Sequence, residues 1–231
     1  MPITPAEARS TFPAAEELVY LDAAAVSLIS ESTFQAVQDF LDLCLHPASS
    51  DASGHHLDLD EGRHRAIEEA AKLLNGDQDE IALVESTTHG LNIAANAIPL
   101  QRGDQILIAD TEYLQVAIPW KMKEESAGVE IIPVRTGPNG SLDPGHFEDA
   151  MTGRTRVVCV SSVQWCSGNR IDLGPLGAIC RDRGVFLVVD AIQHLGACPL
   201  DVQETPVDVL MAGGHKWLNA PFGCGVLYVS P

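Results

Sequence analysis

The chain has 231 residues, of which 45% are hydrophobic and 20% are charged. These values are typical of a globular protein with a sizeable core and argue against intrinsic disorder. The formal net charge of −18 disfavours nucleic-acid binding, because the chain has no excess of basic residues to neutralise phosphates. We therefore expect a soluble protein without a nucleic-acid partner.

Membrane and export signals are missing from the sequence. It contains no run of 18 apolar residues, and its first residues lack an apolar signal core. The six cysteines are scattered, and several lie in apolar runs, which is typical of reduced core cysteines in a cytoplasmic protein. We assign no metal site, because one His- and Asp-rich cluster matches no metal motif and is expected to be a polar loop. That cluster is His55, His56, Asp58, Asp60 and His64.

The first predicted elements are helical. Apolar residues recur at helical spacing over 31–45, and five of them lie on one side of the predicted helix. These are Phe34, Val37, Phe40, Leu41 and Cys44. A loop is expected at 46–62, where Ser, Asp and His are frequent, and a second helix at 65–74 is closed by Asn75 and Gly76.

Short apolar runs then alternate with helical segments. Strands are predicted at 80–84, 105–109, 129–134, 156–160, 185–189, 207–211 and 225–229. Helices are predicted between most of them, at 88–97, 115–127, 144–151 and 174–183. This alternation predicts an α/β fold with a mainly parallel central sheet and helices on both faces. We divide the chain into an N-terminal segment and helix at 1–60 and a large domain at 61–231.

Polar residues follow several of these strands. Ligands of open parallel sheets bind beyond the carboxyl ends of the strands. Thr87 and Thr88 begin a helix after the first strand, where hydroxyls and free N–H groups could bind a phosphate, although an ordinary N-cap is the alternative. Tyr113 follows the second strand and could place its ring on a ligand, although packing is the alternative.

An acid and a lysine give the strongest functional signal. Asp190 follows the apolar run at 185–189, and Lys216 follows Gly213, Gly214 and His215. This pattern indicates a pyridoxal 5′-phosphate (PLP) site, in which the lysine amine would form a Schiff base and the acid would keep the pyridine nitrogen protonated. Several polar strand ends at one edge favour a shared site over chance polarity.

These stretches resemble the class V aminotransferase family of fold-type I PLP enzymes. The family includes cysteine desulfurases, selenocysteine lyases, kynureninase-like enzymes and isopenicillin N epimerase-like proteins. The resemblance runs from about residue 17 to the end of the chain and is carried by four stretches. They are Val-Tyr-Leu-Asp-Ala-Ala at 19–24, Ser-Thr-Thr-His-Gly-Leu-Asn at 86–92, Val-Asp-Ala-Ile-Gln at 189–193 and Gly-His-Lys-Trp at 214–217.

The resemblance implies a role for each matching residue. Lys216 would carry the Schiff base and move a proton at the substrate α-carbon. Asp190 would pair with the pyridine nitrogen, and Gln193 would hydrogen-bond the phenolic oxygen of the cofactor. His215 and Thr88, with backbone groups near Thr87, would bind the phosphate.

The chain also departs from the family pattern. Many relatives have Ser where this chain has Gly213, so one phosphate hydroxyl is missing. Cysteine desulfurases stack a His on the cofactor, and here Tyr113, or Leu114 if the alignment shifts by one residue, takes that position. Those enzymes carry an Asn near Trp165, and their early segment often has an Asn where this chain has Ala23. These departures favour the epimerase-like or selenocysteine-lyase-like branch.

Length is a further departure. Relatives continue into a small C-terminal domain, which usually supplies an arginine for the substrate carboxylate and, in desulfurases, the cysteine that takes the sulfur. This chain stops at Pro231, and none of its six cysteines occupies that position. Cys166 and Cys224 are expected to be buried packing residues. We therefore expect a fragment, a truncated gene product or an isolated domain that holds most of the cofactor site and little of the substrate site, without the small C-terminal domain.

The resemblance implies a cytoplasmic, homodimeric PLP enzyme that acts on an amino acid by desulfuration, elimination, epimerisation or amino transfer. Two alternatives stay open at this point. One is a catalytically inactive remnant that keeps the fold, and the other is a non-enzymatic acidic interaction domain. The sequence names neither the substrate nor the bond that breaks, since PLP performs the electronic work and the protein selects the bond.

Overall fold

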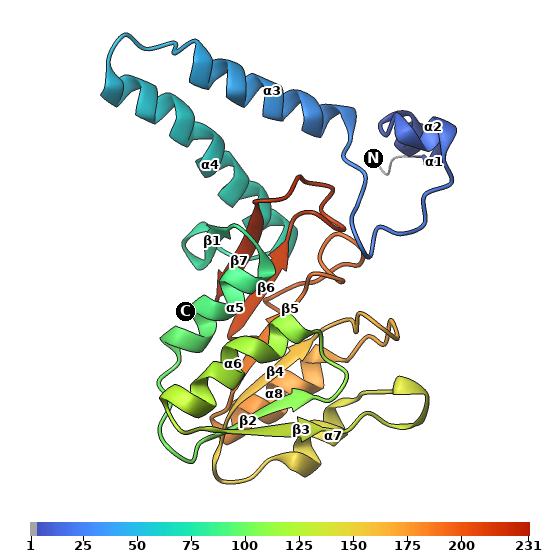
Figure 1. Ribbon diagram of the computed structural model, residues 1–231, viewed down its shortest axis with the longest axis vertical. Coiled ribbons are helices and arrows are strands. Elements are labelled where there is room, and N and C mark those ends of the chain that lie inside the picture. Colours follow the sequence, from blue (N-terminus) through green and yellow to red (C-terminus); the bar gives the residue numbers. More distant parts are fainter. Residues whose placement is uncertain (1–3) are drawn as a thin grey trace.

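A central sheet carries helices on both faces, and a pair of helices projects from it (Figure 1). The computed structural model describes residues 4–231. The helices in this part of the chain are α1 (Pro5–Ser10), α2 (Ala14–Glu17), α3 (Glu31–Leu45), α4 (Ala52–Leu74), α5 (Thr87–Ala97), α6 (Leu114–Ser126), α7 (Pro144–Ala150) and α8 (Leu173–Arg183), with short 3-10 turns η1 (Gln78–Glu80) and η2 (Pro138–Gly140). The strands are β1 (Ile81–Val84), β2 (Gln105–Ala109), β3 (Glu130–Val134), β4 (Thr155–Ser161), β5 (Phe186–Asp190), β6 (Val209–Gly213) and β7 (Gly225–Val229).

The strands form one sheet in the order β1-β7-β6-β5-β4-β2-β3. Strands β2 to β6 pair in parallel, whereas β7 pairs antiparallel with both β6 and β1. β1 therefore runs in the same direction as β6, and only β7 is reversed in the sheet described by residues 4–231. The prediction of a mainly parallel sheet is confirmed. The carboxyl ends of the other six strands lie at one common edge.

Both faces of the sheet are buried, because successive residues of a strand point to opposite sides. In β2, Ile106 and Ile108 belong to the apolar cluster under α5 and α6, whereas Leu107 and Ala109 belong to the cluster under α4, α7 and α8. All four side chains are at most 4% exposed. A strand covered on both faces explains the unbroken apolar runs in the sequence.

All seven strands lie within two residues of their predicted positions. The largest shift is at β6, which was expected at 207–211 and spans Val209–Gly213. Val207 donates its N–H to the carbonyl of Thr205, in a local turn rather than in the sheet. Gly213 instead still pairs with Gly225 of β7, so the strand ends directly before the loop that carries Lys216.

The loop predicted at 46–62 is wrong from residue 52 onward, because α4 already begins at Ala52. The side chain of Asp51 caps this helix by accepting hydrogen bonds from the N–H groups of Ser53 and Gly54. The Ser, Gly, Asp and His residues of this stretch favour loops and caps in isolation, but an exposed helix tolerates them. The domain division that we expect at residue 60 falls inside α4 and stays a prediction.

The end of α4 follows the prediction. Asn75 takes the left-handed conformation with φ of 55°, which Asn adopts more readily than most residues, and its N–H closes the helix. α3 also has the predicted bounds, and its N-cap hydroxyl, on Ser30, accepts from the N–H of Thr33.

The α3 helix and the first half of α4 extend away from the sheet (Figure 1). The predicted apolar side of α3 exists but is exposed, with 46% exposure at Phe34, 51% at Phe40 and 59% at Leu41. No residue of α3 is buried by the part of the chain that the structure describes. Within residues 4–231, no helix is both long enough and apolar enough to cross a membrane.

Candidate functional site

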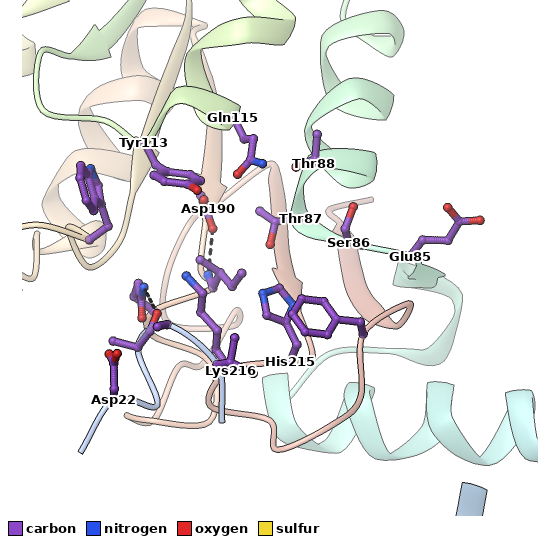
Figure 2. Close-up of a pocket in the computed structure, with 17 residues that line it drawn as sticks. Asp22, Glu85, Ser86, Thr87, Thr88, Tyr113, Gln115, Asp190, His215 and Lys216 are labelled. Carbon is purple, nitrogen blue, oxygen red and sulfur yellow. Dashed lines mark hydrogen bonds between the residues drawn. The ribbon is translucent and has the colours of Figure 1, made fainter. Parts of the chain in front are cut away.

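A cavity of about 710 Å³ lies at the common edge formed by the carboxyl ends of the strands. All seven residues singled out from the sequence line it, and they come from segments that are far apart in the chain. These residues are Thr87, Thr88, Tyr113, Asp190, Gln193, His215 and Lys216. Figure 2 shows several of these side chains converging on the same space. The fold therefore brings the predicted site residues together.

Asp190 is the buried acid of this cavity. It ends β5 and is 4% exposed, and one carboxylate oxygen, Oδ1, accepts a 2.9 Å hydrogen bond from the N–H of Ile192. Burial raises the pKa of the Asp190 carboxyl to about 7, and Glu112 adds to the rise, while the Ile192 N–H and Lys216 oppose it. Its other oxygen has no hydrogen-bond donor among residues 4–231. The carboxylate therefore lacks a full set of partners.

Lys216 is half-buried in the loop that follows β6. Burial lowers the pKa of its ammonium group, and the Asp190 carboxylate opposes that effect. The two ends of this loop are joined, because the N–H of Gly214 donates to the carbonyl of Cys224 at 2.8 Å. A Cβ at Gly214 would lie 2.9 Å from the Cβ of Ala220, so a larger residue would displace the loop. This close contact explains why glycine precedes His215.

The hydroxyl-rich helix start predicted from the sequence is present. Ser86 is the N-cap of α5, and its hydroxyl accepts from the N–H of His89 at 3.1 Å. Thr87 is 6% exposed, and its hydroxyl accepts from the backbone N–H of Gly213 at 2.8 Å. The same hydroxyl still has a proton to donate. Thr88 is half-buried at the same helix start.

His215 lies beside this helix start in the cavity (Figure 2). Its ring stacks on Phe222, with centroids 4.4 Å apart and an angle of 18° between the planes. Burial lowers the pKa of the His215 imidazole, and the nearby Lys216 lowers it further. A largely neutral imidazole at this position can donate one hydrogen bond and accept another.

Gln193 links three segments of the site. Its side-chain N–H donates to the carbonyl of Ala24 at 2.9 Å, and its oxygen accepts from the indole N–H of Trp217 at 2.8 Å. The N-terminal segment is also tied to the lysine loop, because the N–H of Ser27 donates to the carbonyl of His215 at 2.9 Å. One amide proton of Gln193 is left for a further acceptor.

Of Tyr113 and Leu114, only Tyr113 contributes to the cavity lining. Tyr113 lines the cavity, whereas Leu114 is 72% exposed and lies outside the lining. The Tyr113 ring meets the Trp165 ring edge to face, with centroids 5.5 Å apart. Trp165 also lines the cavity.

Sequence reasoning missed three parts of the site. Phe222 lines the cavity through a position whose only sequence signal is its closeness to Lys216. Asp22 and its neighbours line it from the N-terminal segment, where the resemblance was noted but no role was assigned. Glu112 lies just behind the lining and accepts hydrogen bonds from the N–H of Ser161 at 2.8 Å and the amide of Gln164 at 2.6 Å. Burial raises the pKa of the Glu112 carboxyl, and these hydrogen bonds oppose the rise.

The cysteine expectations were only partly correct. Cys159 and Cys180 are buried, but Cys166 is exposed and Cys224 is half-buried, with its thiol donating to the carbonyl of Pro221. The prediction that Cys166 and Cys224 are buried packing residues is therefore wrong for Cys166, and Cys224 is only half-buried. No cysteine among the described residues lines the cavity.

Comparison with known proteins agrees with the fold. The family model for Aminotransferase class-V matches residues 19–231. A probable cysteine desulfurase of Methanothermobacter thermautotrophicus is 29% identical over 97% of this chain and 56% of its own length. A cysteine desulfurase of Klebsiella pneumoniae is 31% identical over 92% of this chain and 53% of its own length.

Solved structures give the same picture. The crystal structure of the cysteine desulfurase CsdA from Escherichia coli is 28% identical, with a TM-score of 0.90, and the match covers 100% of this chain and 59% of CsdA. A variant of the protein C-DES, which has a glycine covalently linked to its PLP cofactor, shares the fold at a TM-score of 0.89 and 23% identity. The chain spans a little more than half the length of these relatives. Class V aminotransferases use PLP, and this chain belongs to that family.

Proposed function

We propose that this chain carries the cofactor site of a PLP-dependent enzyme that acts on an amino acid. The observation that carries the proposal is the placement of Asp190 and Lys216 in one cavity, although the two residues come from different strand ends. When bound, PLP supplies an electron sink for negative charge at the α-carbon of an amino acid. The remaining functions belong to side chains of the chain itself.

The residues present fit this cofactor. A buried carboxylate with one oxygen lacking a donor, as at Asp190, fits a protonated ring nitrogen, because pairing with a cation would reverse the effect of burial on its pKa. A hydroxyl-bearing helix start at Thr87 and Thr88 fits a phosphate, which is attracted by free N–H groups and by the helix dipole. A half-buried amine at Lys216 fits an aldehyde.

Lys216 has two roles in the proposal. It holds the cofactor covalently through its Nζ atom, and it accepts or returns a proton at the substrate α-carbon. The lowered pKa of its ammonium supports base work near neutral pH, since a smaller fraction of the amine is protonated than in water. Asp190 would hold positive charge on the ring nitrogen of the cofactor.

Five residues complete the proposed cofactor site. His215, Thr87 and Thr88 bind the phosphate, and the chain has Gly213 where relatives offer a further hydroxyl. Tyr113 stacks on the ring, which its place in the cavity lining supports. Gln193 donates to the phenolic oxygen with the amide proton that the Ala24 carbonyl does not use.

The reaction is proposed only as a class, which comprises desulfuration, elimination, epimerisation and amino transfer. The matched relatives named as cysteine desulfurases favour sulfur chemistry. No cysteine of the described residues lines the cavity, however, so a sulfur-accepting thiol is not among the groups facing Lys216. Elimination, epimerisation and amino transfer need no such thiol.

The proposal extends to the setting of the enzyme. The exposed apolar side of α3, with Phe34 and Phe40, supports a homodimer, because such a surface is stabilised by contact with a second protein surface. Free thiols at Cys159 and Cys180 support the reducing cytoplasm. The segments 1–60 and 61–231 are proposed as an N-terminal segment and a PLP-binding large domain.

The experiment is cofactor uptake by the purified 231-residue chain. PLP is added, the absorbance spectrum is recorded, borohydride is used to fix the cofactor, and the labelled peptide is mapped. We expect one label on Lys216, and no label in Lys216→Ala. Lys72→Ala, which removes an exposed lysine paired with Glu69 outside the cavity, is the matched control and should label like the wild type.

Two results would contradict the proposal. A label distributed over surface lysines would mean that the cavity does not select the cofactor. A folded wild-type chain that takes up no PLP would favour the catalytically inactive remnant or the acidic interaction domain. These two are then separated by a pull-down, since only the interaction domain requires a specific protein partner.

A further inference from the structure

Two aromatic rings form one wall of the cavity that contains Lys216. Tyr113 and Trp165 both line the cavity, and their rings meet at an angle of 65° with centroids 5.5 Å apart. This is the edge-to-face arrangement that aromatic pairs prefer. Figure 2 shows the Tyr113 ring beside Asp190, above the space into which Lys216 extends. The two rings come from the loops after β2 and β4, respectively.

Polar contacts behind the rings hold this aromatic wall in place. The indole N–H of Trp165 donates to the carbonyl of Thr111 at 3.0 Å. The neighbouring Glu112 accepts from the N–H of Ser161 at 2.8 Å and from the amide of Gln164 at 2.6 Å. These bonds tie the two loops to each other. The rings are therefore positioned before any ligand arrives, which lowers the entropic cost of binding.

The aromatic wall keeps a large apolar area exposed. Trp165 is 53% exposed and Tyr113 is 44% exposed. Because the indole N–H already has an acceptor, only the ring of Trp165 remains to contact a ligand. Phe222 and Ile192 add apolar surface elsewhere in the same cavity. Small-molecule sites with such a lining select apolar groups, and their few polar groups orient the ligand.

We propose that Trp165 determines substrate specificity and that the substrate is an amino acid with an aromatic or large apolar side chain. The inference rests on the proposed function, since Lys216 and the cofactor define where the α-carbon lies. A small side chain, such as that of alanine or serine, would leave the ring of Trp165 in water. A large apolar side chain would cover this ring and add an aromatic contact.

The test is amino-acid binding to the PLP-loaded chain, followed through the change in cofactor absorbance, so it does not depend on turnover. L-phenylalanine is compared with L-alanine and L-serine in the wild type, Trp165→Ala and Trp165→Phe. Leu114→Ala is the matched control, because Leu114 is an exposed apolar residue next to Tyr113 that does not line the cavity.

We expect the wild type to bind L-phenylalanine about tenfold more tightly than L-alanine, which is the effect of one well-packed aromatic contact. Trp165→Ala should lose most of this preference while it retains PLP, and Trp165→Phe should keep part of it. The Leu114→Ala variant should keep all of it.

The outcomes separate the two proposals. If borohydride fixes no PLP in the wild type, the proposed function is overturned, and the inference with it. PLP fixed on Lys216 with equal affinity for L-phenylalanine and L-alanine would overturn the inference alone. A preference that Trp165→Ala retains would also overturn it, and so would a loaded chain that responds to none of the three amino acids.

Discussion

The hydroxyl of Thr87 accepts a 2.8 Å hydrogen bond from the backbone N–H of Gly213, which lies 126 residues further along the chain. Both groups are buried, and the bond joins the start of α5 to the end of β6. The helix start proposed to bind the phosphate is thereby held in register with the loop proposed to bind the aldehyde. One side chain thus sets the spacing between the two ends of the proposed cofactor site.

Thr87→Val should destabilise the fold by about 1–3 kcal/mol, because it leaves the buried Gly213 N–H without an acceptor. Thr87→Ser keeps the hydroxyl and should recover most of the loss. Urea unfolding of the cofactor-free chain measures both variants. Equal midpoints for Thr87→Val and the wild type would mean that water or another group satisfies this N–H.

Asp190 should make the stability of the cofactor-free chain depend on pH. Burial raises the pKa of its carboxyl from 3.8 to about 7. The contribution of Asp190 to the free energy of unfolding is therefore fully present below pH 3.8. It is lost as the pH rises to about 7, by roughly 4 kcal/mol at most. Asp190→Asn removes this pH-dependent contribution. Between pH 5 and 7.5 the wild type should lose stability relative to Asp190→Asn, as measured by urea unfolding, and parallel pH profiles would refute the assignment.

Glu112 should influence Asp190 from behind the cavity. The Glu112 carboxylate contributes to the raised pKa of Asp190, so Glu112→Gln should shift the pH dependence described above to lower pH. The substitution also places an amide against the amide of Gln164, in place of an acceptor at 2.6 Å, which should cost about 1 kcal/mol. Urea titrations across the same pH range separate the two effects. A lower stability with an unchanged pH midpoint would show a structural role alone.

Two helix glycines should respond in opposite directions to alanine. A Cβ at Gly177 in α8 would lie 2.0 Å from the carbonyl oxygen of Pro206, so Gly177→Ala must displace the backbone and should cost about 1–3 kcal/mol or more. At Gly62 in α4 nothing lies within 4 Å of such a Cβ, and Gly62→Ala should add about 0.5–1 kcal/mol. Thermal unfolding compares them directly. A destabilised Gly62→Ala would place an unseen contact on α4.

The exposed side of α3 should control self-association. Replacing Phe34 and Phe40 by Ser removes apolar surface and should lower the apparent mass measured by light scattering at high concentration. Gln35→Ser is the control, since residue 35 is exposed and lies about 100° from Phe34 and about 140° from Phe40 around the helix axis, on the side opposite the apolar residues. A monodisperse monomer in the wild type would remove the support for the homodimer.

Much of the fold was predictable because buried parallel strands leave continuous apolar runs. The direction of β7 was not, since Gly225 to Val229 would look the same in either orientation and only its pairing with β6 and β1 sets it. The first half of α4 was missed because His55 and Asp58 carry no apolar periodicity. Its start is marked instead by the cap at Asp51.

The site residues also divide into those that local sequence predicts and those that only the folded structure reveals. Asp190, Lys216 and the glycines before Lys216 belong to short sequence patterns that indicate their chemistry. The contacts of Gln193 with Ala24, 169 residues away, and of Glu112 with Ser161, 49 residues away, exist only after folding. No local spacing encodes such pairs, so the support behind the cavity had to come from the structure.

Because β7 is reversed, Lys216, which carries the proposed reactive amine, lies in a loop that connects two neighbouring strands of the sheet. Because β7 runs back beside β6, the loop at 214–224 forms a hairpin whose stems each have a second strand on the outer side, β5 and β1. Most loops at this edge continue into a helix and can move with it. Lys216 instead lies in the loop between β6 and β7, and this loop can open only when these two strands separate within the sheet. The amide of Gly214, which donates to the Cys224 carbonyl at the base of this hairpin, should therefore be among the slowest loop positions to exchange with solvent, and changes in the surrounding helices should leave the position of Lys216 largely unaltered.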